Sequence, residues 1–597
     1  ARPSLPTRLL VPASAAAREA GQRKRHRMAE SGSRRCVEVE SQQLLGGDAG
    51  AGAPLPTARC AKFVVALATA AVAGAAAVGW AAGKAPIEAN NKALVAAYDF
   101  APAGDGTYGF ARLVESSKDG PAWEEKEQVP IRRDFPYPID GVVVDIDASS
   151  VFQAIQGFGG AFTESSSTLF QKLNAENQEQ FLNEYFGPDG LEYTLGRVHI
   201  NSCDFSIDHY SYDDVPGDLN LDNFDSSAKH DEDNGLIGLM QRAQAKVKER
   251  GQELKMLASP WSPPAWMKTN GQMGLSGSPG LRPDFRDVWA RYLAKWVSAF
   301  KAKGLPMWAM TVQNEPEANS SFEACLFTPE YEADFLGDFL GPTMRAAHPD
   351  VKIFVFDHNK DRAFDYSRVA LDHATASQYI SGVAFHWYAG DHFDQVERLR
   401  QQYPSAMLLP SEATYEKWRW DPSTSYNWAF GEGYAHDIIG DLNAGGVGWI
   451  DWNLLLDMGG GPNHVGNLCD AAMMADVGQQ KLWKHPQYFF IGHFSKYLPP
   501  TSRRLVTIVT GSVKYVGDPR PYGQCSGKDG LQATAFLRPD QRIAVVVLNC
   551  GDIAIDYKLR NGACAMEGHM PAHGIQTWIL EDMPQCLLAP PPSSYLQ

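Results

Sequence analysis

Eight short apolar runs of strand type follow one another between residues 157 and 450, and mixed or helical stretches separate most of them. Strands that alternate with helices predict βαβ units with parallel strands. Eight such units close into a (β/α)8 TIM barrel, whose functional residues lie at the carboxyl ends of the strands. The runs occupy residues 157–160, 195–199, 256–258, 308–312, 353–356, 382–385, 407–409 and 447–450. The sequence therefore predicts an α/β fold built on a TIM barrel.

Two glutamates follow the fourth and seventh runs and are predicted to end those strands. Glu315 lies in an Asn-Glu-Pro motif at 314–316, and Glu412 lies in Ser-Glu-Ala at 411–413. Cleavage of a glycosidic bond needs a carboxylic acid that protonates the leaving oxygen and a carboxylate that attacks the sugar or activates water. A solvated surface position is the alternative for either residue alone, since the chain has 70 acidic side chains. Together the two residues predict acid/base chemistry on a sugar bond.

The residues beside Glu315 extend this prediction. An amide at Asn314 can hydrogen-bond a sugar 2-hydroxyl, a contact that strengthens as the transition state develops positive charge. The Asn-Glu-Pro unit resembles the acid/base signature of the large clan of retaining glycosidases built on (β/α)8 barrels. In that clan the acid/base residue ends strand four and the nucleophile ends strand seven.

Longer motifs resemble the glucosylceramidases of glycoside hydrolase family 30. The resemblance covers roughly residues 105–582 and is densest in the barrel. Its motifs lie at 156–161, 202–207, 258–262, 268–271, 386–388, 451–454, 460–463 and 492–496. It implies a retaining β-glucosidase of the lysosomal acid type that hydrolyses glucosylceramide to glucose and ceramide, with Glu315 as acid/base and Glu412 as nucleophile.

The same resemblance implies a set of substrate-binding residues. Four would line the glucose subsite: Asp204, Trp261, Asn314 and Trp452. Four would support the carboxylates or the sugar: Arg197, His386, Tyr388 and Asn453. The alternative for the two tryptophans is aromatic core packing, and for the arginine it is a buried structural ion pair.

Elementary chemistry gives several of these residue types a reason. Asp204 can accept sugar hydroxyls as a charged acceptor, which makes stronger hydrogen bonds than a neutral one. Arg197 near Glu412 would keep the nucleophile ionised, whereas Glu315 must stay protonated until it donates. We therefore expect two unequal pKa values and an acidic or near-neutral pH optimum. No spacing typical of a metal site is present, and no cofactor is expected.

The chain also departs from the family pattern. Residues 85–150 lack the paired cysteines of that family, the loop at 318–325 is shorter and lacks the expected aromatic residues, and His464 stands where a tryptophan is expected. These loops frame the lipid-facing side of the site, so the aglycone stays open. The alternatives are a family member acting on steryl glucosides or another β-linked glycan, and a catalytically inactive carbohydrate-binding protein, which the intact glutamate pair argues against.

Net charge and the resemblance bear on partners. The formal charge of −16 at pH 7 argues against a nucleic-acid partner, which favours a basic face. The resemblance implies a glycosphingolipid substrate at a membrane surface and a lipid-transfer activator protein.

The N-terminal part reads as targeting sequence. Residues 1–60 are rich in Ala, Arg, Ser and Gly and are predicted to be disordered, untranslated or part of a targeting segment. Residues 63–83 form 21 uncharged positions after Arg59 and Lys62, about the length that spans a bilayer. We expect a signal peptide or a signal anchor at 61–84, the alternative being a buried helix. Either signal puts the catalytic part in the lysosomal or vacuolar lumen or outside the cell, anchored or free.

Apolar runs at 505–509, 543–548 and 577–580 predict a β domain after the barrel, and the run at 142–146 is expected to join it. This layout gives an all-β sandwich formed from both ends of the catalytic segment. The predicted boundaries are 85–150 for its N-terminal part, 151–496 for the barrel, 497–583 for the C-terminal part and 584–597 for a disordered tail. Cys525, Cys550, Cys564 and Cys586 could form disulfides in an oxidising compartment, in pairings that sequence leaves open.

Overall fold

The computed structural model describes residues 107–133, 141–416, 427–515, 517 and 520–581. The predictions for residues 1–60, 61–84 and 584–597, and for the beginning of 85–150, lie outside these ranges. Among the described residues, no helix combines the length and apolar character that a bilayer crossing requires.

Eight parallel strands form one sheet whose spatial order follows the order of the chain. Strand β12 pairs in parallel with β5, and a parallel bridge between Leu408 and Gly446 closes the ring. The predicted TIM barrel is therefore confirmed. Its strands are β5 (Gly157–Phe162), β6 (Leu195–Ile200), β7 (Lys255–Pro260), β8 (Ala309–Thr311), β9 (Lys352–Asn359), β10 (Ile380–His386), β11 (Met407–Glu412) and β12 (Gly448–Asn453).

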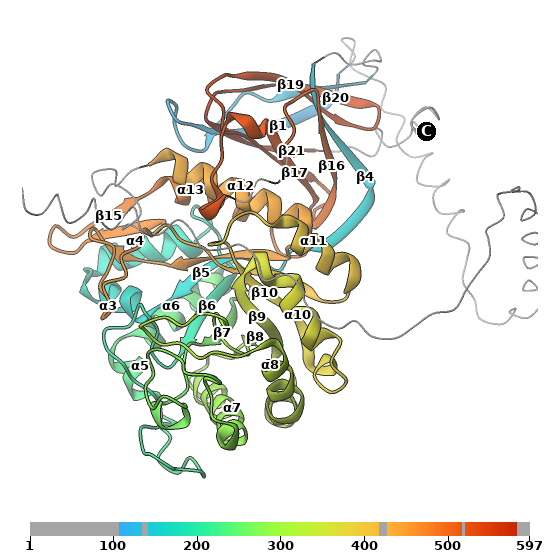
Figure 1. Cartoon of the computed structure of the whole chain (residues 1–597). Helices are drawn as coiled ribbons and strands as arrows, with labels where there is room; N and C mark the ends of the chain where they lie inside the picture. The colour runs from blue at the N-terminus through green and yellow to red at the C-terminus, as the bar shows by residue number, and fades with distance from the viewer. Residues whose placement is uncertain (1–106, 134–140, 417–426, 516, 518–519, 582–597) are drawn as a thin grey trace, which may run out of the picture. The chain divides into compact units, whose positions relative to one another are not determined.

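Helices surround this ring, as Figure 1 shows. In α7 the apolar side chains of Trp289, Leu293, Trp296 and Phe300 recur every three or four residues and are buried, which is the pattern of a helix packed along one face. The helices are α3 (Glu164–Lys172), α4 (Ala175–Phe186), α5 (Lys229–Asp233), α6 (Leu236–Glu249), α7 (Arg286–Ala302), α8 (Pro329–Phe335), α9 (Gly341–Ala347), α10 (Ala363–Leu371), α11 (Phe393–Gln402), α12 (Trp428–Ala444) and α13 (Pro486–Ser495). A small sheet lies between α12 and α13 in the chain: β13 (Leu456–Asp457), β14 (Met473–Asp476) and β15 (Lys481–Lys484).

Strands from both ends of the described chain form a second, all-β domain. Strand β1 pairs antiparallel with β21, and β4 pairs antiparallel with β16, so the blue and orange-red strands of Figure 1 lie side by side. A pairing between β1 and β3 joins the two ends of the sheet. The strands are β1 (Thr107–Ser117), β2 (Glu124–Glu125), β3 (Val129–Arg133), β4 (Val142–Ala154), β16 (Arg503–Thr510), β17 (Leu531–Leu537), β18 (Ile543–Asn549), β19 (Ile555–Asn561), β20 (Cys564–Met570) and β21 (Gly574–Leu580).

Strand β18 shows how the β domain joins the barrel. Val545 and Val547 belong to the core of the β domain, whereas Val546 and Leu548 belong to the core that includes the barrel helices. Successive side chains of a strand point to opposite faces, so a strand buried on both faces is a continuous apolar run. The run at 543–548 is continuously apolar because its side chains are buried in a core on each face of the sheet.

A disulfide links Cys525, in the segment between β16 and β17, to Cys550 at the end of β18, with their Cα atoms 5.9 Å apart. Cys564 is also disulfide-bonded. Among the described residues, Cys203, Cys325 and Cys469 are free thiols and are buried. Stable disulfides are typical of proteins that fold in an oxidising compartment.

Candidate active site

Glu315 and Glu412 approach each other at the carboxyl end of the barrel. Glu412 is the last residue of β11, but Glu315 lies four residues beyond Thr311, the last residue of β8, rather than at the strand end. One carboxylate oxygen of each glutamate and one ring nitrogen of His386 all lie within 4.8 Å of one another. Retaining glycosidases hold their two carboxyl groups about 5–5.5 Å apart, and inverting ones hold them about 6.5–9.5 Å apart. An approach of two carboxylate oxygens to within 4.8 Å is closer to the retaining spacing than to the inverting one.

The backbone holds Glu315 in an uncommon conformation. Its φ angle is 45°, in the left-handed region that residues other than glycine seldom adopt. The Asn314 N–H donates to the carbonyl oxygen of Pro260 at 2.8 Å, and the Glu315 N–H donates to that of Asp357 at 2.9 Å. These bonds to the neighbouring strands β7 and β9 compensate the local strain and aim the side chain into the barrel mouth.

Arg197 connects the second glutamate to the strands around it. Its fully buried guanidinium donates to Glu412 Oε2, to Asn314 Oδ1 at 2.7 Å and to Asp357 Oδ2 at 2.9 Å. Burial opposes the charge on Asp357, but Arg197 and His386 outweigh it and hold the pKa of that carboxyl well below its usual range. The sequence interpretation missed Asp357, although it directly follows the apolar run at 353–356. The buried ion pair of Arg197 is therefore observed, and it includes Glu412; the functional role of Arg197 stays a prediction.

Tyr388 fixes the other oxygen of Glu412. Its hydroxyl donates to Glu412 Oε1 at 2.7 Å, while Arg197 holds Oε2. A donor on β6 and a donor in the loop after β10 thus restrict the rotation of this carboxylate.

His386 lies between the carboxylates of Glu315 and Asp357. Its Nδ1 is 3.1 Å from Glu315 Oε1, and its Nε2 is 3.0 Å from Asp357 Oδ1. Burial lowers the pKa of His386, but the charge of Glu412 and the bonds to Asp357 and Glu315 raise it to about 9. Burial raises the pKa of Glu315, but His358, whose Nδ1 is 3.5 Å from Oε1, and the hydrogen-bonded His386 lower it well below its usual value. This direction is opposite to the one expected for a protonated acid.

Geometry explains the difference. Both nitrogens of His386 face carboxylate oxygens, so the Glu315–His386 contact holds one proton, on either Nδ1 or Oε1. The His386 ring faces three acidic groups, Glu315 and Glu412 on Nδ1 and Asp357 on Nε2, so the shared proton favours His386 over Glu315. The proton needed for acid catalysis is therefore shared by Glu315 and His386 and cannot be assigned to either residue alone.

A cavity of about 340 Å³ opens in front of the two glutamates. Seven of the ten predicted site residues line it: Asp204, Trp261, Asn314, Glu315, Tyr388, Glu412 and Trp452. Arg197 and His386 are buried behind these side chains. Asn453 was expected to support the carboxylates or the sugar, but it does not line the cavity. Its Oδ1 accepts a hydrogen bond from Thr163 at 2.7 Å instead.

Trp261 and Trp452 are packed against each other and also line the cavity, and their contact with glucose stays a prediction. Trp261 and Trp452 stack with their ring centres 5.3 Å apart, and the Arg197 guanidinium lies 4.8 Å and 5.4 Å from the two rings. Both rings are thus packed against each other and also contribute to the cavity wall. Such a stack places a cation against aromatic faces beside the nucleophile candidate.

Asp204 differs from the charged acceptor that we expected. Burial, followed by the charge of Glu412, raises the pKa of Asp204 to about 8. Its Oδ2 accepts a hydrogen bond from Asn467 Nδ2 at 2.8 Å. A pKa of about 8 favours the neutral carboxylic acid at acidic and neutral pH, which can both donate to and accept from a sugar hydroxyl.

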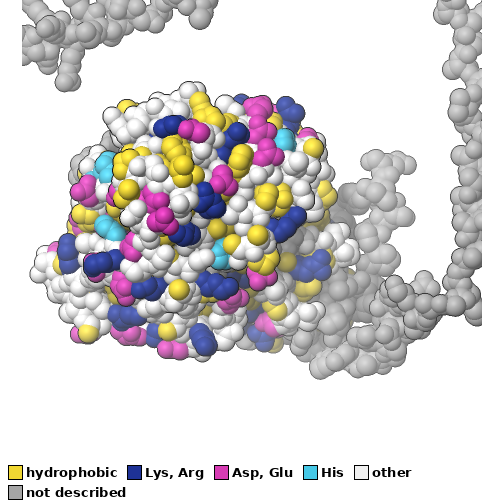
Figure 2. Space-filling model, turned by 90° about the horizontal axis from the view of Figure 1, so that it is seen from below, with side chains coloured by type: hydrophobic (Ala, Val, Ile, Leu, Met, Phe, Trp, Pro, Cys, Tyr) yellow, Lys and Arg dark blue, Asp and Glu magenta, His cyan; other side chains and the backbone are white. Residues whose placement is uncertain are grey.

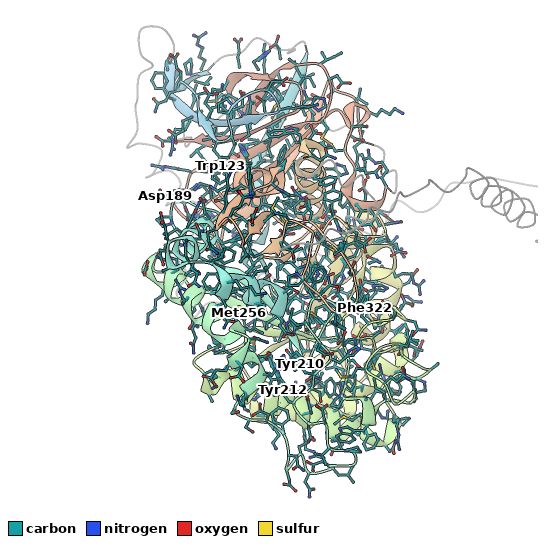
Figure 3. The ribbon with its side chains drawn as sticks, turned by 90° about the vertical axis from the view of Figure 1, so that its left-hand side faces the viewer. Trp123, Asp189, Tyr210, Tyr212, Met256 and Phe322 are labelled. Atoms are coloured by element: carbon teal, nitrogen blue, oxygen red, sulfur yellow. A yellow bond between two sulfur atoms is a disulfide. The ribbon has the colours of Figure 1, made fainter. Side chains whose placement is uncertain are left out.

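Other cavity residues were not predicted. Phe322, labelled in Figure 3, lines the cavity from the 318–325 loop, and Asn467 lines it from the loop after β12. Tyr522 comes from the segment between β16 and β17 in the β domain; its hydroxyl donates to Glu416 Oε2 at 2.7 Å, and its ring centre is 5.9 Å from that of Tyr388. No local signal in the sequence places a β-domain tyrosine in the barrel mouth. The β domain therefore contributes directly to the site.

A (β/α)8 barrel that holds two carboxylates at retaining distance in an aromatic-lined cavity has the architecture of a glycoside hydrolase. The chain belongs to glycoside hydrolase family 30. The description of the glycosyl hydrolase family 30 TIM-barrel domain matches residues 155–498, and that of the family 30 β-sandwich domain matches residues 523–578.

Individual relatives agree with this family. The chain is 34% identical over 423 residues to the lysosomal acid glucosylceramidase of Mus musculus (68% of this chain, 77% of that protein). It is 35% identical over 426 residues to putative glucosylceramidase 3 of Caenorhabditis elegans (69% and 80%). It is 28% identical over 463 residues to the endo-1,6-β-D-glucanase neg1 of Aspergillus fumigatus (74% and 87%).

A solved structure has the same fold. SrfJ from Salmonella typhimurium superimposes with a TM-score of 0.71 at 31% sequence identity, covering 80% of this chain and 100% of that one. The protein is thus a family 30 glycoside hydrolase, and the relatives' names include both glucosylceramidases and an endo-glucanase.

Proposed function

We propose that this protein is a retaining β-glucosidase that hydrolyses glucosylceramide to glucose and ceramide. The observation that supports the proposal most strongly is the pair of Glu315 and Glu412 at retaining distance in one cavity. The glucosylceramidase relatives support the substrate.

In the first step, Glu412 attacks the anomeric carbon and the bond to the leaving oxygen breaks. The leaving oxygen takes the proton held by the Glu315–His386 pair, through Glu315. A glucosyl ester on Glu412 results. In the second step, Glu315 takes a proton from water, the water oxygen attacks the anomeric carbon, and the ester bond to Glu412 breaks, so the configuration is retained.

The glucose would lie against Trp261 and Trp452, with Asp204 and Asn314 on its hydroxyls. Arg197 donates to the carbonyl oxygen of Asn314, so the amide NH2 group remains for the sugar 2-hydroxyl. Tyr388 and Arg197 would orient the nucleophile, and His386 would orient the acid/base. Asn453 would have no direct contact with the sugar, because it binds Thr163.

Glucose release should be measured side by side from glucosylceramide in vesicles, from a steryl glucoside and from a soluble β-1,6-glucan. We expect kcat/KM for glucosylceramide to exceed the others by at least about tenfold, which corresponds to about 1.4 kcal/mol of transition-state binding. The endo-glucanase relative defines the competing result. Release of glucan oligosaccharides without glucose from the lipid would assign the protein to that activity instead.

We propose further that catalysis takes place in an acidic lumen at a membrane surface, with a lipid-transfer activator protein as a partner. Ile207, Leu275 and Leu468 are exposed large apolar residues, and each adjoins a loop whose residues line the cavity. On the face shown in Figure 2, acidic and basic side chains are interspersed, without the basic stripe that nucleic acid favours.

Buried Glu332 on α8 makes stability depend on pH in the direction that suits an acidic lumen. Its Oε1 accepts from the Phe356 N–H at 3.0 Å, and burial raises its pKa from 4.5 to about 7. Because the folded-state pKa is the higher one, stability is fully present below about pH 4.5 and falls as the pH rises to about 7. The shift is equivalent to about 3 kcal/mol above that range.

We therefore expect Glu332→Gln to be more stable than the parent protein at pH 7.5, with the difference shrinking as the pH approaches 5. Thermal unfolding at both pH values measures this. Glu330→Gln, on the exposed side of the same helix, is the control and should follow the parent protein. Parallel pH dependences for Glu332→Gln and the parent would contradict the prediction.

Tyr522 is expected to contribute to binding of the group that leaves. Tyr522→Ala should raise KM for aryl and lipid glucosides by about tenfold, since an aromatic contact is worth about 0.5–1.5 kcal/mol. Tyr522→Phe should keep most of the affinity. The control is Tyr515→Phe in the same segment, whose hydroxyl donates to Asp391 outside the cavity. Steady-state kinetics check this, and an unchanged KM in Tyr522→Ala would refute it.

A further inference from the structure

Three loops at the barrel mouth bring His209, Glu323 and His464 together. His209 follows β6, Glu323 follows β8 and His464 lies between β13 and β14, so the residues come from three parts of the chain. One nitrogen or oxygen donor atom of each lies within 4.8 Å of the other two. The ring centres of the two histidines are 4.6 Å apart. This cluster is separate from the Glu315–Glu412 pair and has no role in the proposed reaction.

Glu323 occupies the centre of the cluster. Its side chain is 0% exposed, with His209 Nδ1 2.7 Å from Oε1 and His464 Nε2 3.4 Å from Oε2. A carboxylate that is buried to this extent requires cationic or donor groups around it. The two histidines are the partners that the fold supplies.

The tautomer of His464 is informative. Its Nδ1 is 3.0 Å from the backbone carbonyl oxygen of Ser206, which can only accept, so Nδ1 carries a hydrogen. In neutral His464 the lone pair is then on Nε2 and faces Glu323 Oε2. Histidines that ligate metals are commonly oriented in this way, with the other ring nitrogen donating to a backbone carbonyl.

Within the part of the chain that the structure describes, the buried atoms Nε2 of His464 and Oε2 of Glu323 have no hydrogen-bond partner. Their separation of 3.4 Å exceeds the 2.7–3.2 Å of an N–H···O bond. It equals the spacing of two ligand atoms in a tetrahedral zinc site, which is about 3.4 Å for bonds of about 2.0–2.1 Å. A cation stabilises this pair, either as a proton on Nε2 or as a metal ion that replaces that proton.

We propose that His209, Glu323 and His464 form a binding site for a divalent transition metal, with Zn²⁺ as the best fit to two imidazoles and one carboxylate. A water molecule would complete the tetrahedron. The ion would connect three loops whose other residues, among them Asp204, Phe322 and Asn467, line the cavity, and it would therefore stiffen the cavity rim. The loop that carries His209 is already held by Tyr210 and Tyr212, labelled in Figure 3, which both donate to Asp231.

Metal binding can be tested on the full chain without any assay of activity. The protein is stripped with a chelator, dialysed, and titrated with ZnCl2 at neutral pH by calorimetry, and its metal content is measured by mass spectrometry. We expect one equivalent of Zn²⁺ per chain and a higher Tm in its presence. Co²⁺ in the same site should give the visible absorption of a tetrahedral nitrogen and oxygen environment.

Two variants locate the site. His464→Asn retains a donor near the Ser206 carbonyl but lacks Nε2, and Glu323→Gln is a neutral isostere. Each should weaken Zn²⁺ binding by more than about 100-fold, since even a second-shell partner is worth about 10–100-fold. His569→Ala, which removes an exposed histidine hydrogen-bonded to Asp556 on the β domain, is the control and should bind like the parent protein.

His209→Asn extends the test if Glu323→Gln fails to fold, because His209 is about half exposed and its replacement leaves the buried carboxylate with His464. Loss of binding in His209→Asn and His464→Asn would then support the site. An absence of Zn²⁺ binding by the parent protein, or binding that these variants leave intact, would overturn it. Neither result depends on which glycoside the enzyme cleaves.

Discussion

Glu412→Gln is expected to lower kcat by at least about 10⁴-fold on every β-glucoside, the scale seen when a catalytic nucleophile is removed. The amide cannot form the glucosyl ester, whatever the leaving group. Arg197 can keep its bond to the amide oxygen, and the Tyr388 hydroxyl can turn to accept from the amide NH2 group. The substituted side chain should therefore remain in place, and the loss should reflect chemistry rather than unfolding. Steady-state kinetics on an aryl glucoside and on glucosylceramide measure the effect.

Mass spectrometry provides the direct check on Glu412. A 2-deoxy-2-fluoroglucosyl fluoride should label the parent protein once, on the peptide that contains Glu412, and should not label Glu412→Gln. Glu416→Gln removes a second carboxylate from the same cavity and should keep at least about a tenth of the activity, because Glu416 is held by the Tyr522 hydroxyl rather than by Arg197 and Tyr388. Labelling of another residue, or retained turnover in Glu412→Gln, would refute the assignment.

Glu315→Gln is expected to lower kcat/KM for glucosylceramide by about 10²–10⁴-fold, the usual contribution of a general acid. The alkoxide of ceramide is a poor leaving group and needs the proton. A dinitrophenyl glucoside should lose far less in its first step, because its leaving group departs as a stable anion. Hydrolysis of the glucosyl ester should become slow, so a burst of dinitrophenol should precede a low steady rate.

Added azide should restore turnover of Glu315→Gln by attacking the glucosyl ester without a base, and the product should be β-glucosyl azide. Glu317→Gln, an exposed neighbour paired with Arg362, is the matched control and should behave as the parent protein. Equal losses on the activated and the unactivated substrate would show that Glu315 is not the proton donor.

Replacement of Glu315 is also expected to affect the protonation of His386. Because His386 shares the proton with Glu315 and faces Asp357 on its other nitrogen, replacement of Glu315 should also change the state of His386. The imidazole loses one of the three acidic groups that raise its pKa. A proton NMR signal from the His386 ring should therefore titrate at lower pH in Glu315→Gln than in the parent protein.

Much of the barrel could be read from local sequence, because each of its strands is buried on both faces and appears as a short apolar run whatever its partners are. Glu315 and Glu412 could be found for a similar reason. Parallel strands of a barrel have their carboxyl ends on the same side, so residues that follow two strand runs are expected to lie at the same end of the barrel. The run at 142–146 was likewise expected to join the C-terminal β domain, but its antiparallel pairing with 503–510 was seen only in the structure.

Distances and directions between side chains were decided only by tertiary structure. Asp357 follows an ordinary apolar run, and nothing local shows that its carboxylate binds both Arg197 and His386. Tyr522 reaches the cavity because the β domain packs against the barrel, and His209, Glu323 and His464 meet because three loops converge. The proton position on the Glu315–His386 pair and the neutral state of Asp204 depend on burial and on charges contributed by distant strands. Coulomb and desolvation energies depend on distances and burial in three dimensions, which are set only when the strands close into a ring, so they cannot be read from the order of residues in the chain.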